Sequence, residues 1–220
     1  MSTTFSGGTG TAAPSVSSTG FPVSVTYARQ PSYNRFFAVP LIGFLARYVL
    51  LIPHVICAVV VSLVSVIMHL AAWFPVLSNG TYPEWAYTWS SGAMRWWVRI
   101  YAYQYGLTDV YPPFSLGSND DGYPVRVAFG YPSNPGKFFA IPLIGFIARE
   151  ILLIPHLIVL YILLAVVGVF QLITWAPVLF GGQYPEWGEQ FVGGTLRWLS
   201  RVGAYFYGFS DEYPPFALND

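Results

Sequence analysis

The sequence predicts an all-α membrane protein made of tandem duplicated two-helix hairpins. We expect about four transmembrane helices, with interfacial helices and short cytoplasmic β-segments. Apolar residues make up 55% of the 220 residues and charged residues only 9%, whereas a soluble domain carries about 25% charged residues. So few charges could not cover a soluble surface, so we expect lipid to be part of the solvent.

The second observation is an internal repeat at an offset of 102 residues, running without a gap from Phe21 to the C-terminus. Roughly 45% of the aligned pairs are identical, a strong sign of duplication. We divide the chain into a flexible Ser/Thr/Gly-rich tail (1–20), membrane repeat 1 (21–118) and membrane repeat 2 (119–220). The matching motifs are Pro40-Leu41-Ile42-Gly43-Phe44 with Pro142-Leu143-Ile144-Gly145-Phe146, Leu51-Ile52-Pro53-His54 with Leu153-Ile154-Pro155-His156, Tyr82-Pro83-Glu84-Trp85 with Tyr184-Pro185-Glu186-Trp187, and Tyr111-Pro112-Pro113-Phe114 with Tyr213-Pro214-Pro215-Phe216.

The order of these motifs resembles a bacterial membrane-protein family called "domain of unknown function 4389". The closing Tyr-Pro-Pro-Phe motif and an Arg-Trp-x-x-Arg core carry most of the resemblance, which covers both repeats. One departure is an acidic residue after the Tyr-Pro, Glu84 or Glu186, where such proteins often have a basic one. The resemblance implies a bacterial cell-membrane location and supplies no reaction.

Each repeat begins with two short elements. Residues 22–27 are β-prone and predict a short strand. Residues 36–46 are apolar but too short to span a bilayer, and we expect them to lie in its interface. The strands of the two copies can pair on the cytoplasmic side.

Two longer segments follow in each repeat. Residues 48–81 and 151–184 carry no charge and exceed the ~20 residues that cross a hydrocarbon core. Gly80 and the neighbouring residues end the first long helix. Pro83 and Glu84 then start a second helix over residues 84–105, with Gly106 as its C-cap.

The positive charges predict the orientation. Basic residues precede both long helices, and the loops after them (78–83 and 180–185) have none. The positive-inside rule places both repeat starts in the cytoplasm. Two crossings per repeat satisfy this rule, so we expect a multi-pass protein of the cytoplasmic membrane with cytoplasmic termini.

The best candidate site is an arginine face on the second helix of each repeat. Arg95 and Arg99 share this face with small residues such as Gly92, which allow close approach of another helix. An arginine at bilayer centre costs about 2.5–3.5 kcal/mol, so the helix either buries this face in a bundle or lies among lipid phosphates. Arginine binds phosphates and carboxylates in bidentate fashion. The predicted lipid- or partner-binding residues are Arg95, Arg99, Arg197, Arg201, Trp96 and Trp198.

Other duplicated polar residues give weaker candidates. His54 and His156 would bind a haem or metal if they faced each other; the alternative is a neutral histidine bonded locally. For Glu84 and Glu186 we favour helix-start electrostatics, and for Asp109 and Asp211 turn formation or pairing with arginine, over catalysis. His69 aligns with Gln171 and belongs to no duplicated site.

The sequence contains no phosphate-binding glycine loop, nucleophile motif or zinc spacing, so we expect no enzymatic activity and no cofactor. The net charge of zero argues against nucleic acid as a partner. We therefore expect a non-catalytic membrane scaffold or accessory subunit that binds lipids and other membrane-protein subunits. The alternatives are a carrier of a lipid or small hydrophobic ligand between the repeats and, more weakly, a haem-binding electron-transfer subunit.

Overall fold

The computed structural model describes residues 21–118 and 122–219. The tail predicted for residues 1–20 lies outside them. Each repeat forms a short strand, a 3₁₀ turn, a long apolar helix and a second helix that returns beside it. In repeat 1 these are β1 (Val23–Tyr27), η1 (Arg35–Ala38), α1 (Ile42–Ala71), α2 (Trp73–Asn79) and α3 (Glu84–Gln104); in repeat 2 they are β2 (Val125–Phe129), η2 (Phe138–Ala140), α4 (Ile144–Gly181) and α5 (Glu186–Phe206).

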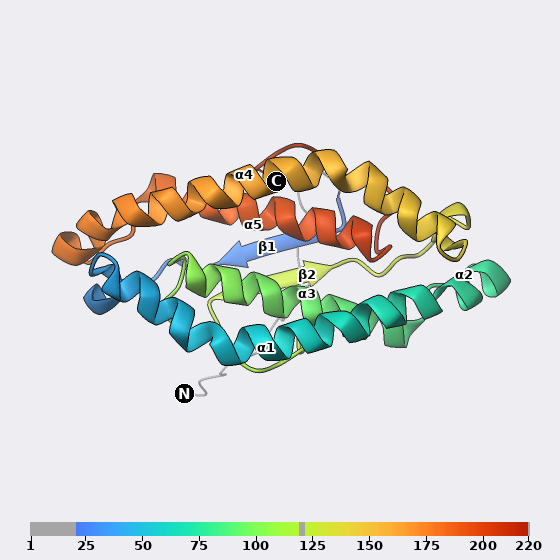
Figure 1. Cartoon of the computed structure of the whole chain (residues 1–220), viewed down its shortest axis with the longest axis horizontal. Helices are drawn as coiled ribbons and strands as arrows, with labels where there is room; N and C mark the ends of the chain where they lie inside the picture. The colour runs from blue at the N-terminus through green and yellow to red at the C-terminus, as the bar shows by residue number, and fades with distance from the viewer. Residues whose placement is uncertain (1–20, 119–121, 220) are drawn as a thin grey trace, which may run out of the picture.

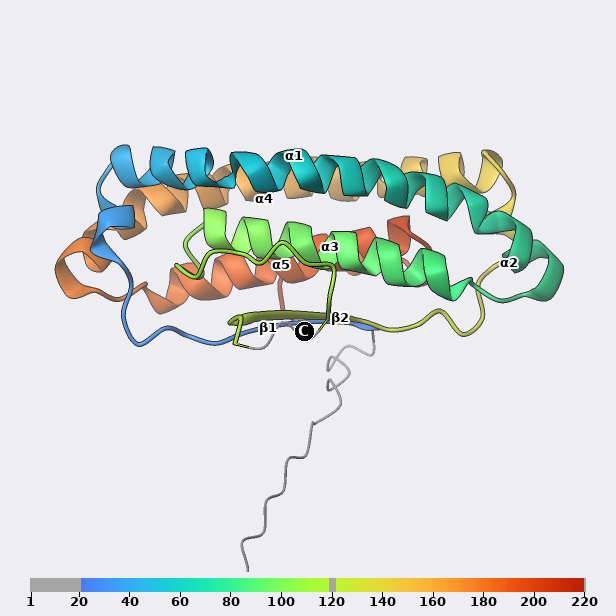
Figure 2. The same cartoon turned by 90° about the horizontal axis from the view of Figure 1, so that it is seen from below.

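The elements form three layers (Figure 2). The long helices α1 and α4 make the first layer, α3 and α5 the second, and the two-stranded sheet the third. α1 packs on α3, α4 packs on α5, and the sheet packs on both shorter helices. The inner side chains of the sheet are buried, whereas Thr26 and Arg126 on its outer side are exposed.

The two repeats are related by an approximate twofold axis. β1 and β2 pair in antiparallel fashion, with Val25 opposite Val127, and these two residues occupy equivalent positions in the repeats. The long helices therefore run in opposite directions (Figure 1). The backbone N–H of Tyr33, near the start of repeat 1, donates to the Gly182 carbonyl at the end of α4 at 3.0 Å.

The twofold relation bears on two expectations, the pairing of the strands and the orientation of the two copies. The predicted pairing of the two strands is confirmed. The charge pattern predicts the same orientation for both copies, whereas the twofold axis makes α1 and α4 antiparallel. The reason is physical: the charge pattern acts within each copy, whereas the strand register between the copies fixes how they are placed against each other.

The glycine signals mark the helix ends well. Gly80 and Gly182 have left-handed backbones at the ends of α2 and α4, with φ of 70° and 67°, a conformation that glycine adopts at little cost. The apolar segment 36–46 is not one interfacial helix. It divides into a 3₁₀ turn and the first turn of α1, so the long helix begins before Arg47.

Most of the surface of the long helices is exposed and apolar. The stretches Ile42–Asn79 and Ile144–Gly181 are each 38 residues long and, by length and composition, apolar enough to cross a membrane; only 22% of the most apolar window of each is buried. We call the exposed side chains of α1 and α4 the apolar face. It includes Ile42, Leu45, Val49, Ile52, Ile56, Val59, Leu63 and Ile67 of α1, and Ile144, Ile147, Ile151, Ile154, Ile158, Ile162, Val169 and Leu172 of α4.

Charge is distributed differently from apolar surface. Within residues 21–118 and 122–219, every exposed charged residue lies outside α1, α2 and α4, and Glu150, near the start of α4, is half-buried. The molecule therefore has an apolar side and a charged side. The exposed charged residues are Arg29, Arg35, Glu84, Arg126, Lys137, Glu186 and Glu212.

Candidate functional site

The predicted arginine face is buried and holds the closing segment of its own repeat. Arg95 donates to the Leu116 carbonyl at 3.1 Å and Arg99 to the Gly117 carbonyl at 3.0 Å. In repeat 2, Arg201 donates to the Ala217 and Asn219 carbonyls at 3.3 and 2.8 Å. The structure thus brings these arginines to backbone carbonyls that follow the Tyr-Pro-Pro-Phe motifs.

Arg197 contacts the sheet. Its Nε donates to the Val25 carbonyl on β1 at 3.3 Å, and its guanidinium lies 5.4 Å from the Tyr27 ring centre. It therefore links α5 of repeat 2 to the strand of repeat 1.

The small residues on this face admit a loop segment where the sequence predicts a helix. A Cβ added to Gly92 would lie 2.7 Å from the Leu116 Cβ, and one added to Gly194 would lie 2.9 Å from the Leu218 Cβ. The closing segments therefore cross the helices directly over these glycines. A sequence pattern of small residues predicts close approach but does not specify what approaches.

Arg47 and Arg149 each form a buried site, one in each repeat, that the sequence motifs did not predict. Arg47 lies in the first turns of α1, forms an ion pair with Asp109, and donates to the Tyr103 carbonyl and, at 3.1 Å, to the Thr108 carbonyl. Its guanidinium carbon lies 4.5 Å from the Phe37 ring centre. Each arginine thus joins the start of a long helix to the end of the second helix.

Repeat 2 reproduces this arrangement. Arg149 forms an ion pair with Asp211 and donates to the Tyr205 and Ser210 carbonyls at 2.6 and 3.2 Å. The arginine pairing considered for Asp109 and Asp211 is therefore confirmed in both repeats. The duplicated Arg47 and Arg149 were the available signal, but the sequence could not pair each with an aspartate 62 residues away.

His54 lies in a closed aromatic box within repeat 1. Its Nδ1 accepts the indole N–H of Trp96 at 2.9 Å. Its ring stacks on Phe114 with 3.7 Å between ring centres and meets Tyr111 edge-on at 4.7 Å. Because an indole N–H can only donate, Nδ1 is the acceptor and the neutral ring carries its proton on Nε2.

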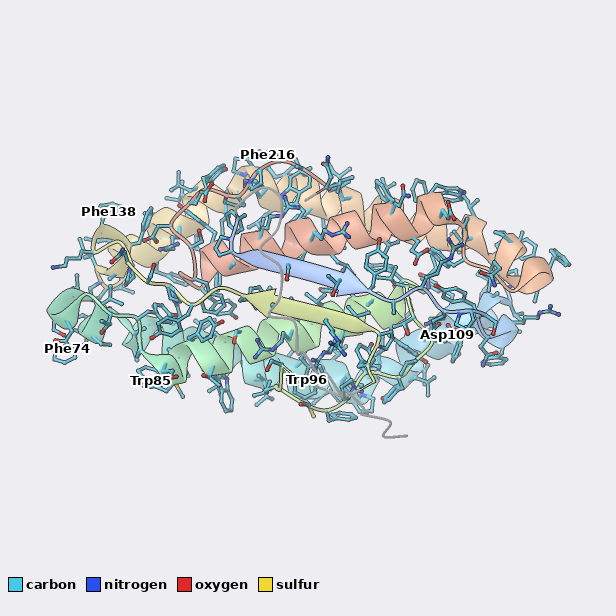
Figure 3. The ribbon with its side chains drawn as sticks, turned by 180° about the vertical axis from the view of Figure 1, so that it is seen from behind. Phe74, Trp85, Trp96, Asp109, Phe138 and Phe216 are labelled. Atoms are coloured by element: carbon cyan, nitrogen blue, oxygen red, sulfur yellow. The ribbon has the colours of Figure 1, made fainter. Side chains whose placement is uncertain are left out.

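His156 lies in an equivalent box, and the two histidines do not face each other. Trp198 donates to the Nδ1 of His156 at 2.9 Å, and Phe216 stacks on its ring at 3.9 Å. Trp96 and Phe216 mark the two boxes and lie beyond opposite edges of the sheet in the view of Figure 3. The arrangement required for a shared haem is therefore not found, and the described residues contain no group of three His, Cys, Asp or Glu side chains placed to hold a metal ion.

Trp96 and Trp198 are buried in these boxes. The sequence predicts both as lipid or partner contacts. In the structure their indoles bond to the histidines of their own repeats, so their role in the fold is local.

The duplicated glutamates lie in the first turns of α3 and α5, as helix-start electrostatics predicts. Glu186 also forms an ion pair with Arg29 of repeat 1 at 2.8 Å. Arg29 lies 3.5 Å from Glu189, whose carboxyl pKa is raised by burial and lowered in part by Arg29. These ion pairs therefore link repeat 1 to the start of α5 in repeat 2.

The Tyr-Pro motifs also join the repeats. The Tyr82 hydroxyl donates to the Tyr207 carbonyl at 2.8 Å, and the equivalent Tyr184 hydroxyl donates to the Tyr105 carbonyl at 3.2 Å. Burial raises the pKa of Tyr184 to about 12, so its hydroxyl remains a neutral donor. Each tyrosine thus caps the end of the second helix of the other repeat.

Two equivalent hollows lie between the repeats, one at each end of the molecule. Each contains about 40 Å³, little more than the roughly 30 Å³ that one water molecule occupies in the liquid. The two linings differ at four equivalent positions, where the first hollow has His69, Ala72, Pro135 and Gly136 and the second has Gln171, Thr174, Tyr33 and Asn34. The first hollow is lined by residues that include His69, Ala72, Trp73, Ala140, Leu143 and Arg149, and the second by residues that include Gln171, Thr174, Trp175, Ala38, Tyr33 and Arg47.

Comparison with known proteins identifies one family. The sequence profile described as Domain of unknown function (DUF4389) matches residues 42–115 and 144–217, once in each repeat. Each match runs from the start of a long helix to the closing segment, and so includes the buried arginine, the aromatic box and the arginine face. No curated protein and no solved structure matches the chain.

Proposed function

The chain belongs to the family described as Domain of unknown function (DUF4389), with two tandem copies, and from this premise we propose that it is a non-catalytic membrane scaffold or accessory subunit. The observation that carries the proposal is the apolar face. Two 38-residue stretches leave most of their apolar side chains exposed. Monomeric soluble proteins rarely expose patches of this extent, which mark protein or membrane interaction sites.

The polar interior also supports a scaffold. The duplicated arginines and histidines bond to groups of the protein itself: Arg47 to Asp109, Arg99 to a closing-segment carbonyl, and His54 to Trp96. Bonds of this kind hold a scaffold in one shape, because a buried polar group left unsatisfied costs free energy.

The test has two stages. Membranes from cells that produce the chain are first washed with alkaline carbonate, and we expect the protein to stay in the pellet. They are then solubilised in mild detergent, and native electrophoresis measures the size of the particle. We expect a complex that contains other polypeptides and exceeds one 24.4 kDa chain with its micelle; a single chain in every mild detergent contradicts the subunit role.

The two hollows favour a second candidate function, the binding of a lipid or small hydrophobic ligand between the repeats. Each hollow combines apolar walls with a buried arginine, Arg149 in one and Arg47 in the other. Their small volume admits part of an acyl chain and not a whole lipid, so the scaffold remains the first proposal.

Native mass spectrometry tests the second candidate. The double variant Ala38→Leu with Ala140→Leu would fill both hollows, so a bound lipid should be lost in this variant and retained in the wild type. The double variant Arg95→Ala with Arg197→Ala is the matched control, because neither arginine lines a hollow. Lipid that survives the double leucine variant but is lost in the control contradicts this location.

A further inference from the structure

We propose that the molecule lies flat in one leaflet, with the apolar face of α1 and α4 on the acyl chains and the sheet toward water on the side from which it inserts. This inference rests on the proposed membrane function and adds the surface that meets lipid. No helix then crosses the bilayer. Four observations support it: helix length, the position of the sheet, the distribution of charge, and the two ends of the molecule.

The long helices exceed the membrane thickness. Each apolar stretch has 38 residues, or about 57 Å at 1.5 Å per residue, against a hydrocarbon core of about 30 Å. A helix of this length fits across only with a tilt well beyond the roughly 40° reached by spanning helices. Lying in the plane of the membrane, it needs no such tilt.

The position of the sheet argues against crossing in this fold. The strands run along the long axis of the molecule and lie near its middle (Figures 1 and 2). If α1 and α4 crossed, the sheet would lie at the bilayer centre with Arg126 exposed to lipid. An exposed arginine is most costly at that depth. In the flat orientation the same side chain faces water.

Charge divides the molecule along its shortest axis. The long helices form one outer layer and the sheet forms the other (Figure 2). Among the described residues no exposed charged side chain lies on α1, α2 or α4, whereas the sheet presents Thr26 and Arg126. A helix with an apolar side on lipid and a polar side on water is typical of interfacial insertion, and here the whole molecule has this division.

The ends of the molecule carry equivalent anchors. Exposed Arg35 and Phe36 precede α1, and exposed Lys137 and Phe138 precede α4. Phe138 lies at the same end as Phe74 of α2, whereas Asp109 lies at the opposite end (Figure 3). Basic and aromatic side chains at both ends suit headgroup level, and only the flat orientation places both ends in one headgroup layer.

Leu41 and Leu143 add an unusual feature beside these anchors. Each has a positive φ, 63° and 62°, in a tight turn. In this turn the N–H of the following residue donates to the carbonyl of the residue before the leucine. A leucine in such a conformation is strained, yet both side chains are about two-thirds exposed, at 67% and 65%. Strain that holds an apolar side chain outward is explained if that side chain enters lipid.

Cysteine labelling distinguishes the possible orientations. In a Cys57→Ala background, single cysteines replace the exposed residues Ser32, Asn79, Asn134 and Gly181. The first and third, and the second and fourth, are equivalent positions in the repeats. A membrane-impermeant maleimide is applied to sealed vesicles of each orientation. We expect all four positions to react from one side only, which the charge pattern predicts to be the cytoplasmic side. In the wild-type chain, which keeps Cys57, we expect this cysteine to react only after detergent is added.

Each other outcome overturns the inference in a distinct way. Reaction of positions 32 and 181 on one side and of 79 and 134 on the other shows crossing along the long axis. Reaction of 32 and 134 opposite 79 and 181 shows two repeats of the same orientation. Protection of Cys57 in a chain that carbonate releases from the membrane shows that protein covers the apolar face, which overturns the proposed membrane function as well.

Discussion

At the scale of single residues, Arg47 should contribute strongly to stability. Its replacement in Arg47→Met leaves Asp109, only 13% exposed, without its cation. Breaking a buried ion pair from one side costs about 3–5 kcal/mol. We expect a loss of this size in the free energy of unfolding, measured by chemical denaturation in mild detergent. The exposed Arg35→Met is the control and should change stability by less than about 0.5 kcal/mol.

The two repeats offer a matched comparison for the same effect. Asp211 is 28% exposed, so water screens it better once Arg149 is replaced. Arg149→Met should therefore cost less than Arg47→Met. Equal losses in the two variants would show that the carbonyl contacts, which are similar in both repeats, contribute more than the carboxylates.

The aromatic boxes give a second prediction at residue scale. Trp96→Phe keeps a ring but removes the N–H that bonds to His54, leaving a buried acceptor unsatisfied at a cost of about 1–3 kcal/mol. We expect Trp198→Phe to lose a similar amount of stability, and thermal unfolding measures the loss in both variants. Trp85→Phe is the control, because Trp85 is half-exposed; a loss in the control as large as in the boxes would contradict a specific role for the indole bond.

At the scale of elements, Gly145 marks the tight contact between α4 and the preceding 3₁₀ turn. A Cβ there would collide with the Phe139 backbone, whereas a Cβ on Gly168 in the same helix meets nothing within 4 Å. We expect Gly145→Ala to lower the thermal midpoint. Gly168→Ala should maintain or raise it, since alanine favours a helix by about 1 kcal/mol over glycine. Equal effects would show that the start of α4 can move away from the turn.

The sequence predicted the structure best at the scale of elements. The returning helix begins at Glu84 as predicted and ends one residue before the predicted end, because proline, glycine and first-turn acids act locally. The sequence did not predict the start of α1, because the charged Arg47 divides the apolar segment 36–46 from the uncharged stretch 48–81. Its charge is neutralised by Asp109, a contact that depends on tertiary structure.

At the scale of the whole molecule, the sequence predicted the duplication but not how the copies are placed. A repeat offset shows which residues are equivalent, and it is the same for parallel and antiparallel copies. The pairing of Val25 with Val127 and the bond from Tyr82 to Tyr207 determine the twofold relation. Neither can be inferred from one copy, so the orientation predicted from charge alone did not anticipate antiparallel long helices.

The twofold relation predicts that one repeat pairs with itself. Residues 21–118 produced alone should form a dimer in mild detergent, because Val25 can face Val25 of a second copy and Arg29 can reach Glu84 in place of Glu186. Repeat 2 alone should pair more weakly, since Tyr131 stands at the position of Arg29 and this ion pair is lost. Light scattering on the purified halves measures both masses. Monomeric repeat 1 at concentrations where the full chain stays folded would show that the cross-repeat contacts are too weak to hold the halves together without the covalent link between them.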